Sequence, residues 1–94
     1  MNKALKLINS KWCLLIIKEL YSNKKLRFSQ LKENLKINSR TLSNELKKLE
    51  KIGLIERKFY NQIPPKVEYC LTKKGKELKI ILIYLQNWYK KWFK

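Results

Sequence analysis

The side chains with the clearest chemical potential lie along one stretch of the sequence, residues 39–51. They carry hydrogen-bonding groups or positive charge, and their spacing is that of a helix face. Arginine, asparagine, serine and threonine suit hydrogen bonding to the edges of nucleic-acid bases, whereas lysine suits phosphate groups. Among them, Asn44 is the one side chain that could pair bidentately with adenine. The candidate residues are Ser39, Arg40, Thr41, Ser43, Asn44, Lys47 and Lys48.

The leucines of the same stretch indicate which face of this helix is buried. Leu42, Leu46 and Leu49 follow helical spacing and form a single apolar stripe. At about 100° per residue, the opposite side carries Arg40, Asn44, Lys47 and Lys51. Any soluble amphipathic helix has polar residues opposite its leucines, so the pattern gains meaning only from the surrounding elements.

Three successive helices are predicted around this stretch. Their expected ranges are Lys11 to Tyr21, Gln30 to Leu35 and Arg40 to Lys51, with Ser10, Ser29 and Ser39 as the respective N-caps. A short leading helix is expected over residues 3–9. Gly53 follows the third helix, at a position where a left-handed residue commonly ends a helix.

A β-hairpin and a long helix are predicted after Gly53. Residues 54–60 are rich in strand formers, and the alternation of Val67, Tyr69 and Leu71 predicts a second strand. A turn that contains two prolines separates them. Thr72 is expected to cap a last helix that runs from Lys73 to about Trp92.

This order of elements is that of a winged helix-turn-helix. We predict one domain over residues 1–94, mainly α with a small β-hairpin, that dimerises through its terminal helices. The helix-turn-helix spans about 29–51, the wing about 54–72 and the C-terminal dimerisation helix about 73–92. In such a fold the second helix of the pair enters the DNA major groove. Further DNA contacts are expected from the start of the second helix and from the wing, at Ser29, Gln30, Lys58, Tyr60, Asn61, Gln62 and Lys66.

The last helix is more apolar than one surface helix requires. Aliphatic residues from Ile80 to Leu85 surround it, and several aromatic residues follow. A domain of this size cannot easily cover them all, so pairing with a second copy is expected. The predicted dimer contacts are Leu82, Leu85, Trp88, Tyr89 and Trp92.

Charge and composition narrow the classes of partner and of activity. The 94 residues carry a formal net charge of +16, which favours a polyanionic partner, either nucleic acid or an anionic membrane surface. The alternative functions are therefore binding to an anionic membrane surface and binding to RNA. The sequence has no histidine and no aspartate, so an enzyme, a metal site or a bound cofactor is not expected. A small-molecule effector stays an open question.

Two cysteines and the apolar runs bear on the compartment. Cys13 and Cys70 form no disulfide framework. Cys13 shares a predicted face with Ile16 and Ile17, which favours a buried thiol, whereas the alternation around Cys70 favours an outward position. The longest apolar runs fall far short of the ~20 residues that span a bilayer, and no signal peptide is evident. A cytoplasmic location without a membrane partner is expected.

Several short motifs, in order, resemble those of HxlR-type transcriptional regulators. They begin with Lys11-Trp12-Cys13-Leu14-Leu15-Ile16-Ile17, Arg27-Phe28-Ser29-Gln30-Leu31 and Ile37-Asn38-Ser39-Arg40-Thr41-Leu42. They continue with Gly53-Leu54-Ile55-Glu56-Arg57 and Pro64-Pro65-Lys66-Val67-Glu68-Tyr69. The resemblance implies a dimeric winged helix protein that binds operator DNA. Many members carry a cysteine shortly before the Lys-Trp motif, but residues 1–10 contain none, which puts thiol sensing of that kind in doubt.

Overall fold

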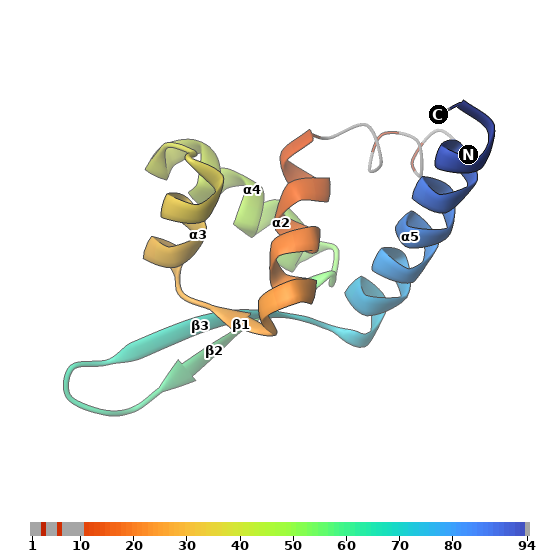
Figure 1. Cartoon of the computed structure of the whole chain (residues 1–94). Helices are drawn as coiled ribbons and strands as arrows, with labels where there is room; N and C mark the ends of the chain where they lie inside the picture. The colour runs from red at the N-terminus through yellow and green to blue at the C-terminus, as the bar shows by residue number, and fades with distance from the viewer. Residues whose placement is uncertain (1–2, 4–5, 7–10, 94) are drawn as a thin grey trace.

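The computed structural model describes Lys3, Lys6 and residues 11–93. The chain runs through α2 (Lys11–Asn23), β1 (Lys25–Leu26), α3 (Phe28–Leu35), α4 (Ser39–Lys51), β2 (Ile55–Tyr60), β3 (Lys66–Leu71) and α5 (Lys73–Phe93), as Figure 1 shows. Lys3 and Lys6 are helical. The rest of the predicted leading helix, and the predicted cap Ser10, lie outside the described residues.

The core forms where α2 meets α3, α4 and the base of the sheet. All three leucines of the α4 stripe are buried, together with Ile16, Ile17 and Leu20 of α2. Helix α2 lies between α3 and α5 in Figure 1, which explains why it is apolar on more than one side. The hydrophobic pattern of these helices therefore predicts their packing.

The sheet has three antiparallel strands in the order β1-β3-β2. The predicted hairpin corresponds to β2 and β3, and β1 was not predicted. A strand of two residues carries no alternation that a sequence pattern could reveal. In the register, Lys25 of β1 and Glu56 of β2 both lie opposite Cys70 of β3. Strand β3 is the central strand, so Cys70 has a neighbouring strand on each side.

Two of the predicted helix caps are wrong by one or two residues. Helix α3 already begins at Phe28, so Ser29 lies inside its first turn rather than before it. The side chain of Gln30 instead accepts a hydrogen bond from the Arg27 backbone N–H, at 2.8 Å. Helix α4 is capped by Asn38, whose side chain accepts from the Thr41 backbone N–H at 2.8 Å, and Ser39 is its first residue.

The junction between α4, the sheet and α5 is held by short polar contacts. Gly53 adopts a φ of +80°, as its position after α4 predicts, and thereby turns the chain toward β2. The Thr72 hydroxyl donates to the Gly53 carbonyl and accepts from the Gly75 N–H at 3.2 Å, which confirms Thr72 as the cap of α5. A Cβ atom at Gly75 would lie 2.1 Å from the Leu54 carbonyl oxygen, so only glycine fits there.

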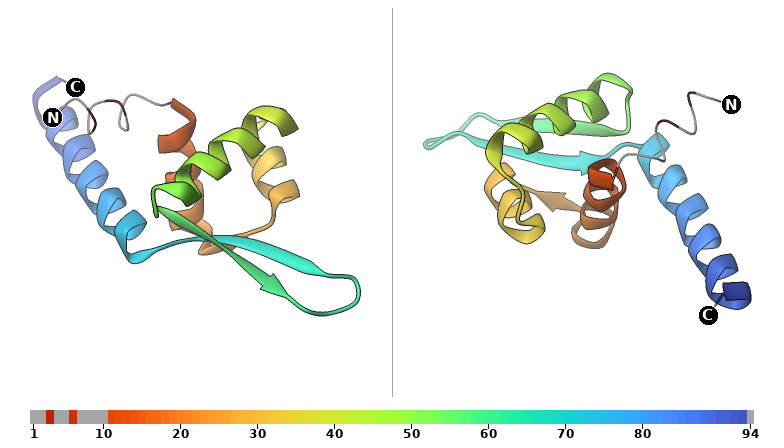
Figure 2. Two further views of the ribbon diagram at one scale, coloured as in Figure 1. Left: turned by 180° about the vertical axis from the view of Figure 1, so that it is seen from behind. Right: turned by 90° about the horizontal axis from the view of Figure 1, so that it is seen from above.

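Helix α5 then leaves the body of the molecule. Its first turns lie near α2, and Figure 2 shows the remainder projecting away from the other helices. The molecule is accordingly elongated, with principal extents of 51 × 26 × 25 Å. Figure 2 also shows the hairpin extending on the side away from α5, so the wing and α5 form opposite ends of the molecule.

Candidate nucleic-acid interface

The outer face of α4 presents the predicted base-reading residues to solvent. Arg40, Asn44 and Lys47 are exposed, while the leucines on the other side of the helix are buried. Ser39 and Lys48 are also exposed, whereas Thr41 and Ser43 are half-buried at the margins of the face. Because one side of α4 is fixed in the core, its polar side is held rigidly outward.

The charges around α4 leave this face positive. Lys48 pairs with Glu45 at 3.3 Å, and the side chain of Lys48 is 75% exposed against 12% for Glu45. Among the residues that the structure describes, Arg40 and Lys47 form no ion pair with a carboxylate. Their charges are therefore available to an anionic partner, whereas that of Lys48 is partly offset by its neighbour.

The start of α3 contributes less than its sequence suggests. Ser29 and Gln30 are both exposed, in agreement with a surface position. The side-chain oxygen of Gln30 accepts one hydrogen bond, from the Arg27 N–H, which fixes this side chain over the start of α3. Ser29, in contrast, is free of a capping role.

The wing is braced at the pair Tyr60 and Lys66, the last pair of β2 and β3 before the turn, and is open elsewhere. Tyr60 is half-buried because the Lys66 ammonium lies 5.0 Å from its ring centre, and the Lys25 ammonium donates to its hydroxyl at 3.5 Å. Lys66 also pairs with Glu68 at 3.6 Å. The remaining predicted wing residues, Lys58, Asn61 and Gln62, are exposed. These contacts orient the hairpin and leave its tip open to a partner.

Two apolar side chains of the wing were missed by the sequence interpretation. Phe59 is 67% exposed, and Ile63, at the tip, is fully exposed. Ile63 lies between polar turn residues and the proline pair, and an isoleucine at that position is itself the signal that could have been noticed. Both could contact sugar or base surfaces of a nucleic acid bound along the wing.

The predicted dimer residues lie on α5, away from the outer face of α4 and from the wing. Leu85, Trp88, Tyr89 and Trp92 are exposed, whereas Leu82 is half-buried. Four further large apolar side chains of the helix are exposed, namely Ile80, Ile81, Tyr84 and Phe93. The Phe93 ring lies 5.3 Å from that of Tyr89 and 5.6 Å from that of Trp88, so the end of α5 carries a continuous aromatic surface.

Sequence comparison identifies the family of this arrangement. Residues 7–94 match the family model of the HxlR-like helix-turn-helix. The chain belongs to the HxlR-like family. The resemblance seen in its motifs is thereby confirmed.

Relatives in the HxlR-like family carry regulator names. An uncharacterised HTH-type transcriptional regulator of Halalkalibacterium halodurans is 47% identical over 86 residues, which cover 90% of this chain and 76% of the relative. One from Methanothermobacter thermautotrophicus is 45% identical over 82 residues, which cover 86% of this chain and 62% of that protein.

Solved structures of similar proteins confirm the winged helix fold. The reduced form of the transcriptional regulator YodB from B. subtilis has a TM-score of 0.90 at 32% identity, with 100% of this chain and 92% of that chain covered. A regulator described as of the MarR family, from Enterococcus faecalis, has a TM-score of 0.89 at 38% identity, with 96% and 82% covered. The redox regulator HypR in its oxidised form has a TM-score of 0.82 at 32% identity, with 96% and 93% covered.

Neither cysteine of this HxlR-like chain is an exposed thiol. Cys13 is buried in the core, as predicted, and burial, assisted by the charge of Glu45, raises the pKa of its thiol to about 11. The outward position predicted for Cys70 is wrong, because its side chain is only 8% exposed. It does lie on the sheet face opposite to Leu71, where Lys25 and Glu56 flank it on the two neighbouring strands. Burial and the hydrogen bond from its thiol to Glu56, at 3.6 Å, raise the pKa of Cys70.

None of the helices in the described part of the chain has the length and hydrophobicity of a membrane span. In the same residues, no group of three or more acidic, cysteine or histidine side chains could hold a metal ion.

Proposed function

We propose that this chain is a sequence-specific, double-stranded-DNA-binding transcriptional regulator that acts as a homodimer in the cytoplasm. The observation that carries the proposal is α4, whose leucine side is buried while Arg40, Asn44 and Lys47 are exposed. A helix held in this way can enter the major groove and present its polar face to base edges. The regulator names of the family relatives support the same function.

Base reading falls to Arg40 and Asn44 in this proposal. Arginine pairs bidentately with guanine and asparagine with adenine, and each such pair discriminates by about 1–3 kcal/mol. Lys47 contributes contacts to phosphate, which add affinity without sequence preference. Ser39, Thr41, Ser43 and Lys48 border this face and complete the contact with the groove. The DNA backbone on either side is contacted from the start of α3 and from the wing, by Ser29, Gln30, Lys58, Tyr60, Asn61, Gln62 and Lys66.

A homodimer follows from the apolar surface of α5. Eight large apolar side chains are exposed on this one helix, and two such helices can cover one another in an antiparallel or crossed pair. A twofold axis near α5 places two copies of α4 on the same side of the DNA, where successive major grooves lie ~34–36 Å apart. Promoter access then changes because the dimer occupies the DNA.

Fluorescence anisotropy tests the DNA-binding function directly. Two duplexes of equal length are titrated across a salt series, one from upstream of the protein's own gene and one of random sequence. Binding to the upstream duplex that survives about 200 mM salt, while random DNA is released, supports sequence-specific regulation. Equal and steeply salt-sensitive binding to both duplexes contradicts specificity for that site, and liposome and RNA titrations then test the alternative partners.

Sedimentation velocity tests the assembly. At micromolar concentration the proposal expects a mass near twice that of the 11.5 kDa chain. A single 11.5 kDa species there contradicts the dimer.

A further inference from the structure

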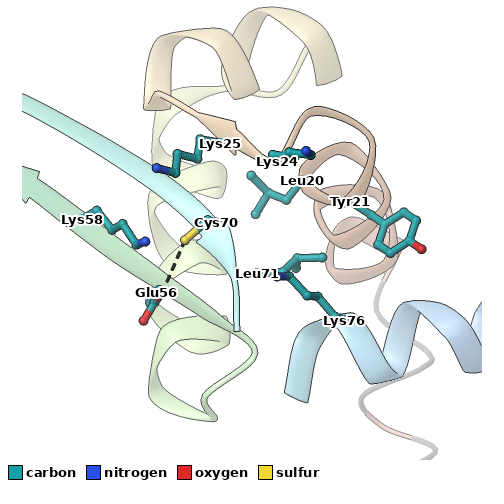
Figure 3. A pocket seen from close by; sticks show the side chains of 9 residues that line it. All are labelled: Leu20, Tyr21, Lys24, Lys25, Glu56, Lys58, Cys70, Leu71 and Lys76. Carbon is teal, nitrogen blue, oxygen red and sulfur yellow. Dashed lines mark hydrogen bonds between the residues drawn. The ribbon is translucent and has the colours of Figure 1, made fainter. Parts of the chain in front are cut away.

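A pocket lies on the side of the sheet away from the α4 leucines. Its volume is about 580 Å³, and it is enclosed by the end of α2, the outer face of the sheet and the first turns of α5 (Figure 3). The row Lys25, Cys70 and Glu56 forms its floor, because these residues pair across the three strands. A volume of this size is typical of small-molecule sites.

Four lysines from separate parts of the chain line this pocket. Lys24 and Lys25 lie at the junction of α2 and β1, Lys58 on β2 and Lys76 on α5. Lys24 adopts a φ of +63°, a left-handed conformation that turns the chain sharply between α2 and β1. In Figure 3 the ammonium end of Lys58 lies toward Cys70, with Lys25 on the other side of the thiol.

The pocket lysines are not neutralised by the protein itself. The one carboxylate in the lining, Glu56, accepts the hydrogen bond from the Cys70 thiol at 3.6 Å. Among the described residues, none of the four lysines forms an ion pair with a carboxylate. Four positive charges against one negative charge leave a positive potential over a partly enclosed surface, which attracts small anions.

The remaining walls are apolar. Leu20, Leu71 and Tyr21 complete the lining. Figure 3 shows the Tyr21 ring directed away from Cys70, and the ammonium of Lys79 on α5 lies 6.0 Å from the centre of that ring. The pocket thus combines phosphate-binding cations with a surface on which a flat organic group can lie. Lysine is a compact point charge that suits phosphate, which needs no planar bidentate partner.

We propose that this pocket binds a small organic phosphate whose organic part lies against Leu71. The phosphate group would contact the lysines that line the pocket, Lys58 among them. Lys58 also belongs to the predicted wing contacts, so a bound phosphate would compete with DNA for this side chain. That regulatory consequence rests on the proposed function, whereas ligand binding does not.

Calorimetric titration of the free protein tests the site with AMP, adenosine and inorganic phosphate at constant ionic strength. AMP is expected to bind more tightly than either of the others, because only AMP uses both the lysines and the apolar wall. The double variant Lys24→Gln/Lys76→Gln is expected to weaken AMP binding by about tenfold. The matched control Lys47→Gln/Lys51→Gln removes the same charge from the exposed face of α4 and should leave AMP binding unchanged. Thermal melts establish that both variants fold.

Three results would overturn the proposal. One is AMP binding no tighter than inorganic phosphate, which means that the apolar wall is not used. Another is equal weakening in both double variants, which means that AMP binds wherever positive charge is dense. The third is no AMP binding at all. Anisotropy with DNA is a separate measurement, so a failure of DNA binding leaves the outcome for the pocket intact.

Discussion

The body of the molecule, which consists of α2, α3, α4 and the sheet, buries its apolar side chains, whereas helix α5 exposes many of its own. Within the body, the leucine stripe of α4 and the inner residues of α2 are almost completely buried. On α5, eight large apolar side chains are exposed, and among its described residues only Gly75 is fully buried. The radius of gyration, 14.3 Å, exceeds the value of about 12 Å for a compact chain of this length, because α5 projects.

This difference indicates that the chain specifies two surfaces with separate purposes. The junction of Thr72, Lys74 and Gly75 fixes where α5 begins, and the Lys74 ammonium donates to the Ile52 carbonyl at 2.9 Å. Leu78 still packs against the core. Beyond it the exposed positions gain no cover from the body, which is the basis of the proposed dimer.

The same substitution in the two regions should give the largest contrast. Leu42→Ala opens a cavity at a side chain with no exposed surface and is expected to lower the free energy of unfolding by about 2–5 kcal/mol. Leu85→Ala, at a side chain that is 50% exposed, should cost far less when the protein is monomeric. Urea denaturation of dilute protein measures both. Equal losses would mean that α5 is packed within its own chain.

Dimerisation should respond to substitutions in these two regions in the reverse order, with the larger effect on α5. Trp88→Ala removes a large aromatic surface that the dimer is expected to bury, and should weaken dimerisation by about 2 kcal/mol or more. Sedimentation equilibrium measures the shift, with Lys90→Ala as a control at an exposed residue of the same helix. If Lys90→Ala dissociates the dimer as strongly as Trp88→Ala, the aromatic surface is not its centre.

The sequence predicts the body better than its polar details. Helical periodicity located the core because each leucine of α4 occupies the same face, and Gly53 and Thr72 marked helix ends through their own chemistry. The caps Ser29 and Ser39 were misplaced because α3 begins after Arg27 and α4 after Asn38, whose side chain is as good a cap as serine. Lys25 and Cys70 pair across a long stretch of sequence, so no local sequence pattern predicts this strand pairing.

The candidate site shows the same division. The outward side of α4 follows from its inward side, so its exposed residues were predictable from spacing alone. The pocket lysines were not, because Lys24, Lys58 and Lys76 are far apart in the sequence and only the fold brings them together. The bracing of Tyr60 by Lys25 and Lys66 is likewise a product of tertiary structure.

The two kinds of side chain on the exposed face of α4 should also differ in their effect on DNA binding. Asn44→Ala is expected to cost about 1–3 kcal/mol on the specific duplex and to relax its sequence preference, as is Arg40→Ala. Lys47→Ala should weaken binding to specific and random duplexes alike and reduce the salt dependence. Anisotropy titrations on both duplexes measure these effects. Equal losses on random DNA for all three variants would contradict base reading by α4.

The pH dependence of stability should separate the buried thiol of the body from the rest of the chain. Burial raises the pKa of Cys13 from 9.0 to about 11, so between these values the unfolded thiol ionises while the folded one stays protonated. Its contribution is fully present below pH 9 and is lost as the pH rises toward 11. At pH 10 the loss is about 1.4 kcal/mol.

The variant Cys13→Ala isolates this contribution, because it removes this thiol and leaves every other side chain in place. Urea denaturation at pH 8 and at pH 10 should show that the parent loses about 1.4 kcal/mol more than Cys13→Ala over this interval. Whatever the substitution itself costs by leaving a small cavity is the same at both pH values and cancels in the comparison. Parallel losses in the two proteins would show that Cys13 ionises as readily in the folded chain as in the unfolded one, and hence that water reaches this part of the body.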